Sequence, residues 1–312
     1  MSDGRLADLP GRVERFLLKA LKEKSLKDYT AALRAFTIEV ECAGFSWKGA
    51  TELERDAFLA EWLVDRHEAG GRRQECVLVV TALHKITPHQ RYKASSAALM
   101  TWAKLEPPKQ APACPEALAG ALVVLAWSLN QREVALCMGF CFEGLLRVSE
   151  PLRLRHKDVV ANDEGVCLLL GETKRGLEQK VVIKCRWLQV LLTDFLGTAK
   201  HGPDDEVFGI GYARVHYWLR KLSKALGVEA LELSSHSFRR GGASHLLTLG
   251  WKVEDVCLYG RWASVTSAKE YLRRGETFLT RARLMMSDAL WQRITRLASL
   301  RHCLLQQPII VD

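Results

Sequence analysis

The chain has 312 residues, of which 48% are hydrophobic and 26% are charged, a balance typical of a folded protein of one or two domains. Its formal net charge is +9 and its pI is near 9.1, which favours a polyanionic partner such as nucleic acid. No apolar run approaches the ~20 residues of a membrane-spanning helix, and the charged N-terminus lacks a signal-peptide core. We therefore expect an intracellular protein with no membrane partner.

The nine cysteines contain no Cys-x-x-Cys pair, and Cys137 and Cys141 stand one helical turn apart in an apolar run. A disulfide framework and a zinc site are both disfavoured, and a reducing compartment is expected. The acidic run 204–206 follows Gly-Pro and fits a solvated turn, and the chain has no phosphate-binding P-loop. We predict neither a metal nor a cofactor.

The N-terminal third has a helical pattern from about Val13 to Leu105. Thr51 and Glu54 form a capping box that starts one helix, and further helices are expected over 72–85 and 94–105. Basic residues recur between the apolar positions, and they fit either a solvated helix surface or a nucleic-acid contact. Those singled out are Lys24, Lys27, Arg72, Arg73, Lys85 and Lys93.

Residues 106–115 contain four prolines, too many for a helix or a central strand, and are predicted to be an interdomain linker. At ~3 Å per residue this linker could reach across a DNA duplex. Beyond it, apolar helices are expected over 116–130 and 133–146, and three β-rich runs over 159–160, 166–170 and 180–184. Helices are then predicted over 212–226, 238–249, 253–259 and 266–274, and an amphipathic one over 288–305. The fold class is mainly α with a small antiparallel β-sheet (α+β).

Two arginines are candidates for binding a phosphate, because their guanidinium groups bind phosphate oxygens bidentately and keep their charge. Arg147 lies in an apolar context, and Glu150, three residues on, could hold it in place. Arg239 follows His236 by three residues at a predicted helix start, so both side chains point to one side. The competing interpretations are an ordinary surface ion pair and a capped helix with an incidental histidine.

Three further residues would complete a site for metal-independent phosphoryl transfer. Lys174 lies in the predicted turn between two strands, from which it could protonate a leaving oxygen. Trp262 follows Gly260-Arg261 in a turn and offers an indole N–H. Tyr271, nine residues later, is the candidate nucleophile, with nearby cations favouring its phenolate. Taken singly, each of the three also fits a structural or solvated position.

The order of these residues resembles the tyrosine recombinases, the phage-integrase and Xer-like family. Gly144 to Glu150 looks like the first-arginine box, and Lys174 falls on the family's hairpin lysine. His236-Ser237-Phe238-Arg239 is similar to the His-x-x-Arg box. Gly260-Arg261-Trp262 occupies the place of the Gly-His box with tryptophan instead of histidine, and Tyr271 has the nucleophile's spacing. All six catalytic positions are filled in order.

Two stretches, 239–243 and 260–264, look especially like the recombinases of eukaryotic DIRS and Crypton mobile elements. The family resemblance implies a site-specific recombinase or integrase that cleaves and rejoins double-stranded DNA through a 3′-phosphotyrosyl intermediate, without a metal or a nucleotide cofactor. It also implies a homotetramer on two DNA sites, in the nucleus if the host is eukaryotic and otherwise in the cytoplasm or nucleoid. A type IB topoisomerase-like enzyme and an inactive recombinase-derived DNA-binding protein are the alternatives.

The resemblance also implies a domain organisation. Residues 1–105 are expected to form a helical, SAM-like core-binding domain on DNA, 106–115 the linker and 116–286 the catalytic domain. We expect residues 287–312 to dock into a neighbouring protomer, with packing on the chain's own domain as the alternative. Beyond the N-terminal lysines and arginines, the predicted DNA contacts are Arg153, Arg175, Arg240 and Arg261.

Overall fold

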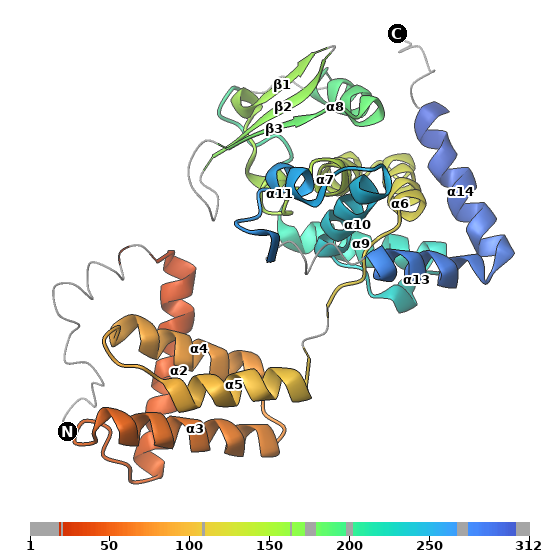
Figure 1. The fold of residues 1–312 in the computed structure, drawn as a ribbon. Helices are drawn as coiled ribbons and strands as arrows, with labels where there is room; N and C mark the ends of the chain where they lie inside the picture. The colour runs from red at the N-terminus through yellow and green to blue at the C-terminus, as the bar shows by residue number, and fades with distance from the viewer. Residues whose placement is uncertain are drawn as a thin grey trace. The chain divides into compact units, whose positions relative to one another are not determined.

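The computed structural model describes residues 19, 21–107, 110–162, 164–171, 179–197, 202–266 and 274–303. The chain divides into two compact units, Met1–Lys109 and Gln110–Asp312, which we describe separately (Figure 1). The division falls inside the proline-rich segment 106–115. Among the described residues, no helix has both the length and the apolar character needed to cross a bilayer.

The N-terminal unit has no strand among its described residues, and its helices there are α2 (Glu23–Cys42), α3 (Glu52–Glu68), α4 (Arg73–Ile86) and α5 (Lys93–Leu105). The predicted capping box at the start of α3 is confirmed. The Thr51 N–H donates to the Glu54 carboxylate at 2.7 Å, and the Glu54 N–H donates to the Thr51 hydroxyl at 3.3 Å. One apolar core joins the helices through side chains that include Phe36, Leu59, Leu63, Val79, Leu83 and Trp102.

The C-terminal unit combines helices with a small sheet, which confirms the predicted fold class. Its helices are α6 (Glu116–Ser128), α7 (Arg132–Glu143), α8 (Arg186–Gly197), α9 (Tyr212–Leu226), α10 (Ser235–Thr248), α11 (Val253–Tyr259), α13 (Arg274–Met285) and α14 (Asp288–Cys303). Short 3-10 turns lie at Pro151–Arg153, His156–Asp158 and Glu229–Leu231. The expected helix over 266–274 falls mostly outside the described residues.

The sheet has the strand order β1-β2-β3 and is antiparallel throughout. Its strands are β1 (Val159–Asn162), β2 (Gly165–Leu170) and β3 (Gln179–Ile183), with Val159 opposite Leu168 and Val166 opposite Ile183. The register pairs Leu170 with Gln179, so the segment between these two residues connects adjacent strand ends. The predicted hairpin residues Lys174 and Arg175 belong to this segment and lie outside the described residues.

Two helices were absent from the sequence-based expectation. α8 buries Trp187, Leu188, Leu191 and Leu192, which form one apolar face of a twelve-residue helix. This face packs against the sheet and against α7 (Figure 1). α13 leaves Phe278 and Leu279 exposed and buries Thr280 and Leu284, so its apolar side chains do not all lie on its buried face.

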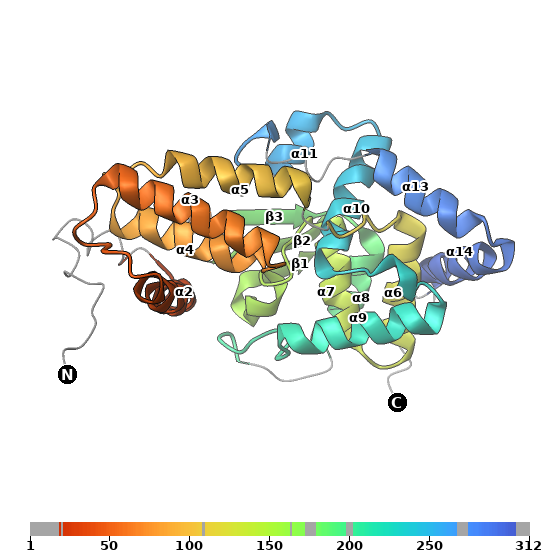
Figure 2. The same ribbon diagram turned by 90° about the horizontal axis from the view of Figure 1, so that it is seen from below.

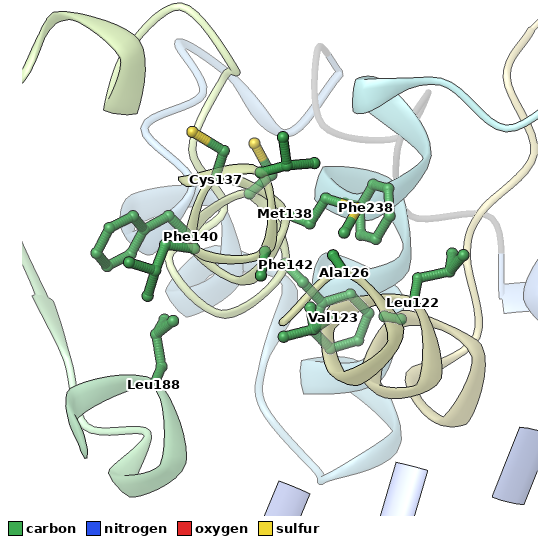
Figure 3. Close-up of a cluster of buried hydrophobic side chains, with 14 of the residues drawn as sticks. Leu122, Val123, Ala126, Cys137, Met138, Phe140, Phe142, Leu188 and Phe238 are labelled. Atoms are coloured by element: carbon green, nitrogen blue, oxygen red, sulfur yellow. The ribbon is translucent and has the colours of Figure 1, made fainter. Parts of the chain in front are cut away.

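The core of this unit is centred on α6 and α7. Both helices are apolar on nearly every face, and most of their side chains are buried, as expected for helices enclosed by other elements. Figure 3 shows Phe142 and Met138 of α7 in one buried cluster with Leu122 of α6 and Phe238 of α10. Leu188 of α8 lies on another side of α7. This core holds α10 between α6, α7, α11 and α13 (Figure 2).

The C-terminal helix α14 packs on α6 of its own chain, and docking into a neighbouring protomer stays a prediction. Ile294, Ala298 and Arg301 are at most 8% exposed. The Arg301 Nε donates to the Ala298 carbonyl at 2.9 Å, and its guanidinium pairs with Glu116. A buried cation matched to a carboxylate thus anchors the helix to the start of α6.

Close backbone packing at Gly242 should be essential for the position of α10. A Cβ atom built at Gly242 lies 2.0 Å from the Phe142 carbonyl oxygen, a backbone atom that cannot turn away. Gly242→Ala is expected to lower the free energy of unfolding by about 1–3 kcal/mol, as overpacking does. Denaturant unfolding measures the change. The matched control is Gly211→Ala, because a Cβ atom added there would have no atom beyond its chain neighbours within 4 Å. An equal fall in the free energy of unfolding in both variants would contradict the packing argument.

Candidate active site

Helix α10 begins at a reciprocal serine cap. The Ser234 N–H donates to the Ser237 hydroxyl at 3.0 Å, and the Ser237 N–H donates to the Ser234 carbonyl at 2.9 Å, so Ser234 is the N-cap residue of the helix. The cap sets His236 in the first turn, where it is exposed. Arg239 follows one turn later and is 1% exposed. The amino end of the helix adds partial positive charge beside the histidine.

The guanidinium of Arg239 connects two distant turns. One of its terminal nitrogens donates to the Leu145 carbonyl and the other to the Gly260 carbonyl. The Arg239 Cζ lies 4.5 Å from the centre of the Trp262 ring, a distance at which cation and ring attract each other. Arg239 therefore holds the turn after α7 and the turn after α11 against α10.

Both turns have a residue in a left-handed backbone conformation. Leu145 has φ +47° and Arg261 has φ +57°, which costs an L-residue roughly 1–2 kcal/mol. The Leu145 carbonyl accepts hydrogen bonds from Arg239 and, at 3.4 Å, from Arg261. These bonds offset the backbone strain and fix the direction of the carbonyl.

Glu150 is the shared partner of two arginines. Its carboxylate accepts the Arg147 backbone N–H at 2.8 Å and the Arg147 guanidinium at 2.9 Å, which confirms the predicted pairing. It also accepts the Arg261 guanidinium at 2.7 Å. The side chains of Glu150 and Arg261 are each 8% exposed, while that of Arg147 is 22% exposed. Of the two arginines, Arg147 is thus the one that faces solvent.

Arg261 was predicted to contact DNA, but its position is that of a structural cation. Burial lowers its pKa, and the nearby charge of Arg147 lowers it further, while Glu150 opposes both effects. Its guanidinium is committed to Glu150 and to the carbonyls of Tyr259 and Leu145. A guanidinium held in this way does not present its donors to a DNA phosphate.

Trp262 is placed by the glycine two residues before it. A Cβ atom at Gly260 would lie 1.7 Å from a carbon of the Trp262 ring, so the indole folds over a backbone position that must lack a side chain. Trp262 is 9% exposed and packs with Leu145, Ala243 and Val256. The two turns and α10 thereby share one small apolar cluster beneath the arginines.

The structure brings Arg147, Glu150, Arg239 and Trp262 into one connected network. His236 stands at the start of the helix that carries Arg239. Lys174 and Tyr271 lie outside the described residues. Within the residues that are described, no group of three or more His, Cys, Asp or Glu side chains could hold a metal ion.

The remaining predicted DNA contacts differ in exposure. Lys24, Lys27, Arg72, Lys85, Lys93 and Arg153 are exposed. Arg73 is partly buried, with its Nε 3.4 Å from the Leu99 carbonyl oxygen. Arg240 was also predicted to contact DNA, but it is 3% exposed and bonds to the chain segment before α6. Arg175 lies outside the described residues.

A basic groove along α9 was not identified from the sequence. Its lining includes Tyr212, His216, Tyr217, Arg220, Lys221 and Lys224, together with Glu229, Glu232 and Ser234, which stands two residues before His236 in the sequence. The Lys221 Nζ lies 4.7 Å from the centre of the Trp218 ring. The sequence does indicate this surface, because basic and aromatic residues recur there at spacings of three and four. The stretch was nevertheless predicted only as a helix.

Comparison with known proteins identifies the family to which the residues of this site belong. Residues 125–277 match the phage integrase family, and this range includes all six predicted catalytic positions. No curated protein matches the chain. Solved structures of recombinases and integrases share the fold at low sequence identity.

The XerH site-specific recombinase bound to palindromic difH substrate has a TM-score of 0.60 and 15% identity, over 91% of this chain and 84% of that chain. The Tn1549 transposon integrase with transposon right end DNA has a TM-score of 0.58 and 12% identity, over 86% and 98%. The lambda integrase dimer bound to a COC′ core site has a TM-score of 0.54 and 15% identity, over 84% and 93%. The chain therefore carries a catalytic domain of the phage integrase family, the tyrosine recombinases, whose members cleave and rejoin DNA.

Proposed function

We propose that this chain is a site-specific DNA recombinase or integrase that cleaves and rejoins DNA through a 3′-phosphotyrosyl bond on Tyr271. The observation that carries the proposal is the bridge from Arg239 to the Leu145 and Gly260 carbonyls. This bridge assembles separate sequence segments, with Arg147 and Trp262, into one cationic site next to His236. Such a site suits a phosphodiester, whose non-bridging oxygens gain charge in the transition state.

Arg147 is proposed to make the first contact with the scissile phosphate. Its side chain is the more exposed of the two phosphate-binding candidates, and Glu150 holds it by one terminal nitrogen, so the other N–H groups remain for phosphate oxygens. Arg239 is 1% exposed. We expect it to reach the phosphate only after a rearrangement that accompanies DNA binding. Trp262 is proposed to add its indole N–H.

In the proposed cleavage step, Tyr271 is the nucleophile, His236 the base and Lys174 the acid. The Tyr271 phenol oxygen attacks phosphorus and its proton passes to His236. The new bond between phosphorus and the tyrosine oxygen forms as the bond to the 5′-oxygen breaks, and the Lys174 ammonium gives a proton to that leaving oxygen. Attack by a 5′-hydroxyl on the phosphotyrosine reverses these steps and rejoins a strand. The roles of Lys174 and Tyr271 rest on their sequence spacing and on the pairing of β2 with β3.

The biological setting of the reaction belongs to the same proposal. The stretches 239–243 and 260–264 favour a recombinase of the DIRS and Crypton type of mobile element. We propose a homotetramer on two duplexes, acting wherever the host keeps its DNA. The mass of the DNA-bound complex distinguishes this tetramer from a topoisomerase-like monomer.

The groove along α9 is proposed to bind the DNA backbone. It places Arg220, Lys221 and Lys224 on an exposed surface that leads to Ser234 at the start of α10. Tyr212 and Tyr217 are more than half exposed and provide apolar faces beside the cations. Phosphate contacts of this kind position a duplex without reading its sequence.

The covalent intermediate is the direct test of the proposed chemistry. Nicked duplexes that carry sites selected by the protein from a random pool should yield a denaturant-resistant adduct in EDTA, with the DNA mapped to Tyr271 by mass spectrometry. Tyr271→Phe should lose the adduct and keep its DNA affinity. Tyr259→Phe is the matched control, because the Tyr259 hydroxyl donates to the Glu143 carbonyl at 2.9 Å and burial raises its pKa. An adduct that persists in Tyr271→Phe, or that is lost only in Tyr259→Phe, would refute the assignment.

Glu150→Gln should destabilise the fold, because Arg147 and Arg261 would lose their shared counter-charge. We expect the free energy of unfolding to fall by about 3 kcal/mol and cleavage to slow with it, measured by denaturant unfolding and by single-turnover adduct formation. Asp204→Asn is the matched control, since Asp204 also pairs with two cations but its side chain is 66% exposed. Similar small losses in both variants would argue against a central role for Glu150.

Arg220→Ala and Lys221→Ala should each weaken DNA binding and reduce the dependence of log K on log salt by about one. The reason is that each lost cation leaves one phosphate with its condensed counterion. Fluorescence anisotropy titrations at several salt concentrations give both quantities. Arg296→Ala, which removes an exposed arginine from α14, is the charge-matched control. A salt slope that is unchanged in the two α9 variants would exclude this groove as a phosphate-binding surface.

A further inference from the structure

Within the sequence Arg239-Arg240-Gly241-Gly242, Arg240 and Gly241 have a role separate from that of the proposed phosphate site. Arg240 is 3% exposed. Its guanidinium donates to the Ala111 carbonyl at 2.6 Å and to the Gln110 side-chain oxygen at 2.7 Å. Both partners belong to the predicted linker, so a buried cation of the catalytic helix binds the chain that enters the catalytic unit.

The same chain segment lies directly on α10. The Cys114 N–H donates to the Ser237 carbonyl at 2.9 Å. A Cβ atom at Gly241 would lie 1.9 Å from the Cys114 carbonyl oxygen and 3.0 Å from its nitrogen. These are backbone atoms, so residue 241 must be glycine for the segment to pass. Residues 110–114 are therefore part of the catalytic unit.

The other end of the predicted linker is held by α5. The Glu106 N–H donates to the Trp102 carbonyl at 2.8 Å, and the Trp102 indole N–H donates to the Glu106 carboxylate at 3.0 Å. Only Pro107, Pro108 and Lys109 stand between Glu106 and Gln110 in the sequence. Four Cα steps of at most ~3.6 Å give a reach of about 14 Å, far less than the ten-residue linker would give.

We propose that Arg240 is a positioning residue that latches residues 110–114 onto α10 and so sets a three-residue tether between the two units. A short tether raises the effective concentration of one unit at its DNA site once the other is bound. Release of the latch as far as Ala113 would lengthen the tether from three residues to seven. With a −3/2 power dependence on length, the gain from joint binding would fall about three- to fourfold. The DNA consequence rests on the proposed function, whereas the latch itself does not.

Trypsin tests the latch without DNA. Cleavage after Lys109 requires several residues on each side to enter the protease in an extended form, and the Arg240 bonds should prevent this on the 110–114 side. We expect cleavage at Lys109 to be roughly tenfold faster in Arg240→Ala and less accelerated in Arg240→Lys, which can hold one acceptor. Gln110→Ala, at an exposed position, removes one bond with little risk to folding and should accelerate cleavage a few-fold.

Full-length chain is used throughout, with melting temperature and cleavage at other sites as controls. Folded variants that are cut at Lys109 no faster than wild type would overturn the latch. In the DNA arm, Arg240→Ala should bind a complete selected site up to about three- to fourfold more weakly, and Gln110→Ala and Arg240→Lys, which each keep one bond, should lose less. Faster cleavage at Lys109 with an unchanged DNA dissociation constant would overturn the tether role while the latch stands. Failure to bind DNA even in wild type would count against the proposed function and leave the trypsin result in force.

Discussion

The catalytic unit depends on one buried guanidinium. Arg239 is among the largest fully buried side chains, and burying its charge is costly unless its donors find acceptors. Here the acceptors are the Leu145 and Gly260 carbonyls, and the Trp262 ring covers one face. A lysine could not replace it, because a point charge on a flexible stem does not bridge two diverging carbonyls. This bridge holds the turns that precede Arg147 and Trp262 against α10.

The arginines of the site separate into different roles. Arg147 is partly exposed and held by Glu150, so a ligand can reach its guanidinium from solvent. Arg261 is buried against the same carboxylate, and Arg240 is buried against the linker. A net charge of +9 thus overstates the number of cations that are exposed and could bind a polyanion. Part of the basicity holds chain segments together, and part lies on exposed surfaces such as α9.

Interactions between residues close together in the sequence were predicted correctly. The spacing of Arg147 and Glu150 predicted their pairing, and the Thr51 capping box predicted the start of α3. The roles of Arg240 and Arg261 could not be predicted, because their partners include backbone carbonyls more than 100 residues away, which carry no side-chain signature. The left-handed turn at Leu145 was equally hidden, because glycine usually marks such a turn.

A structure of the complex trapped as the covalent adduct on a selected DNA site would test the account most directly. We predict that the guanidinium groups of Arg147 and Arg239, the His236 ring and the Trp262 N–H all lie within hydrogen-bond distance of the phosphate. We also predict that the bond from Arg239 to the Leu145 carbonyl persists in the complex. A phosphate bound away from these side chains, or an Arg239 that leaves both carbonyls without a loss of site geometry, would contradict it.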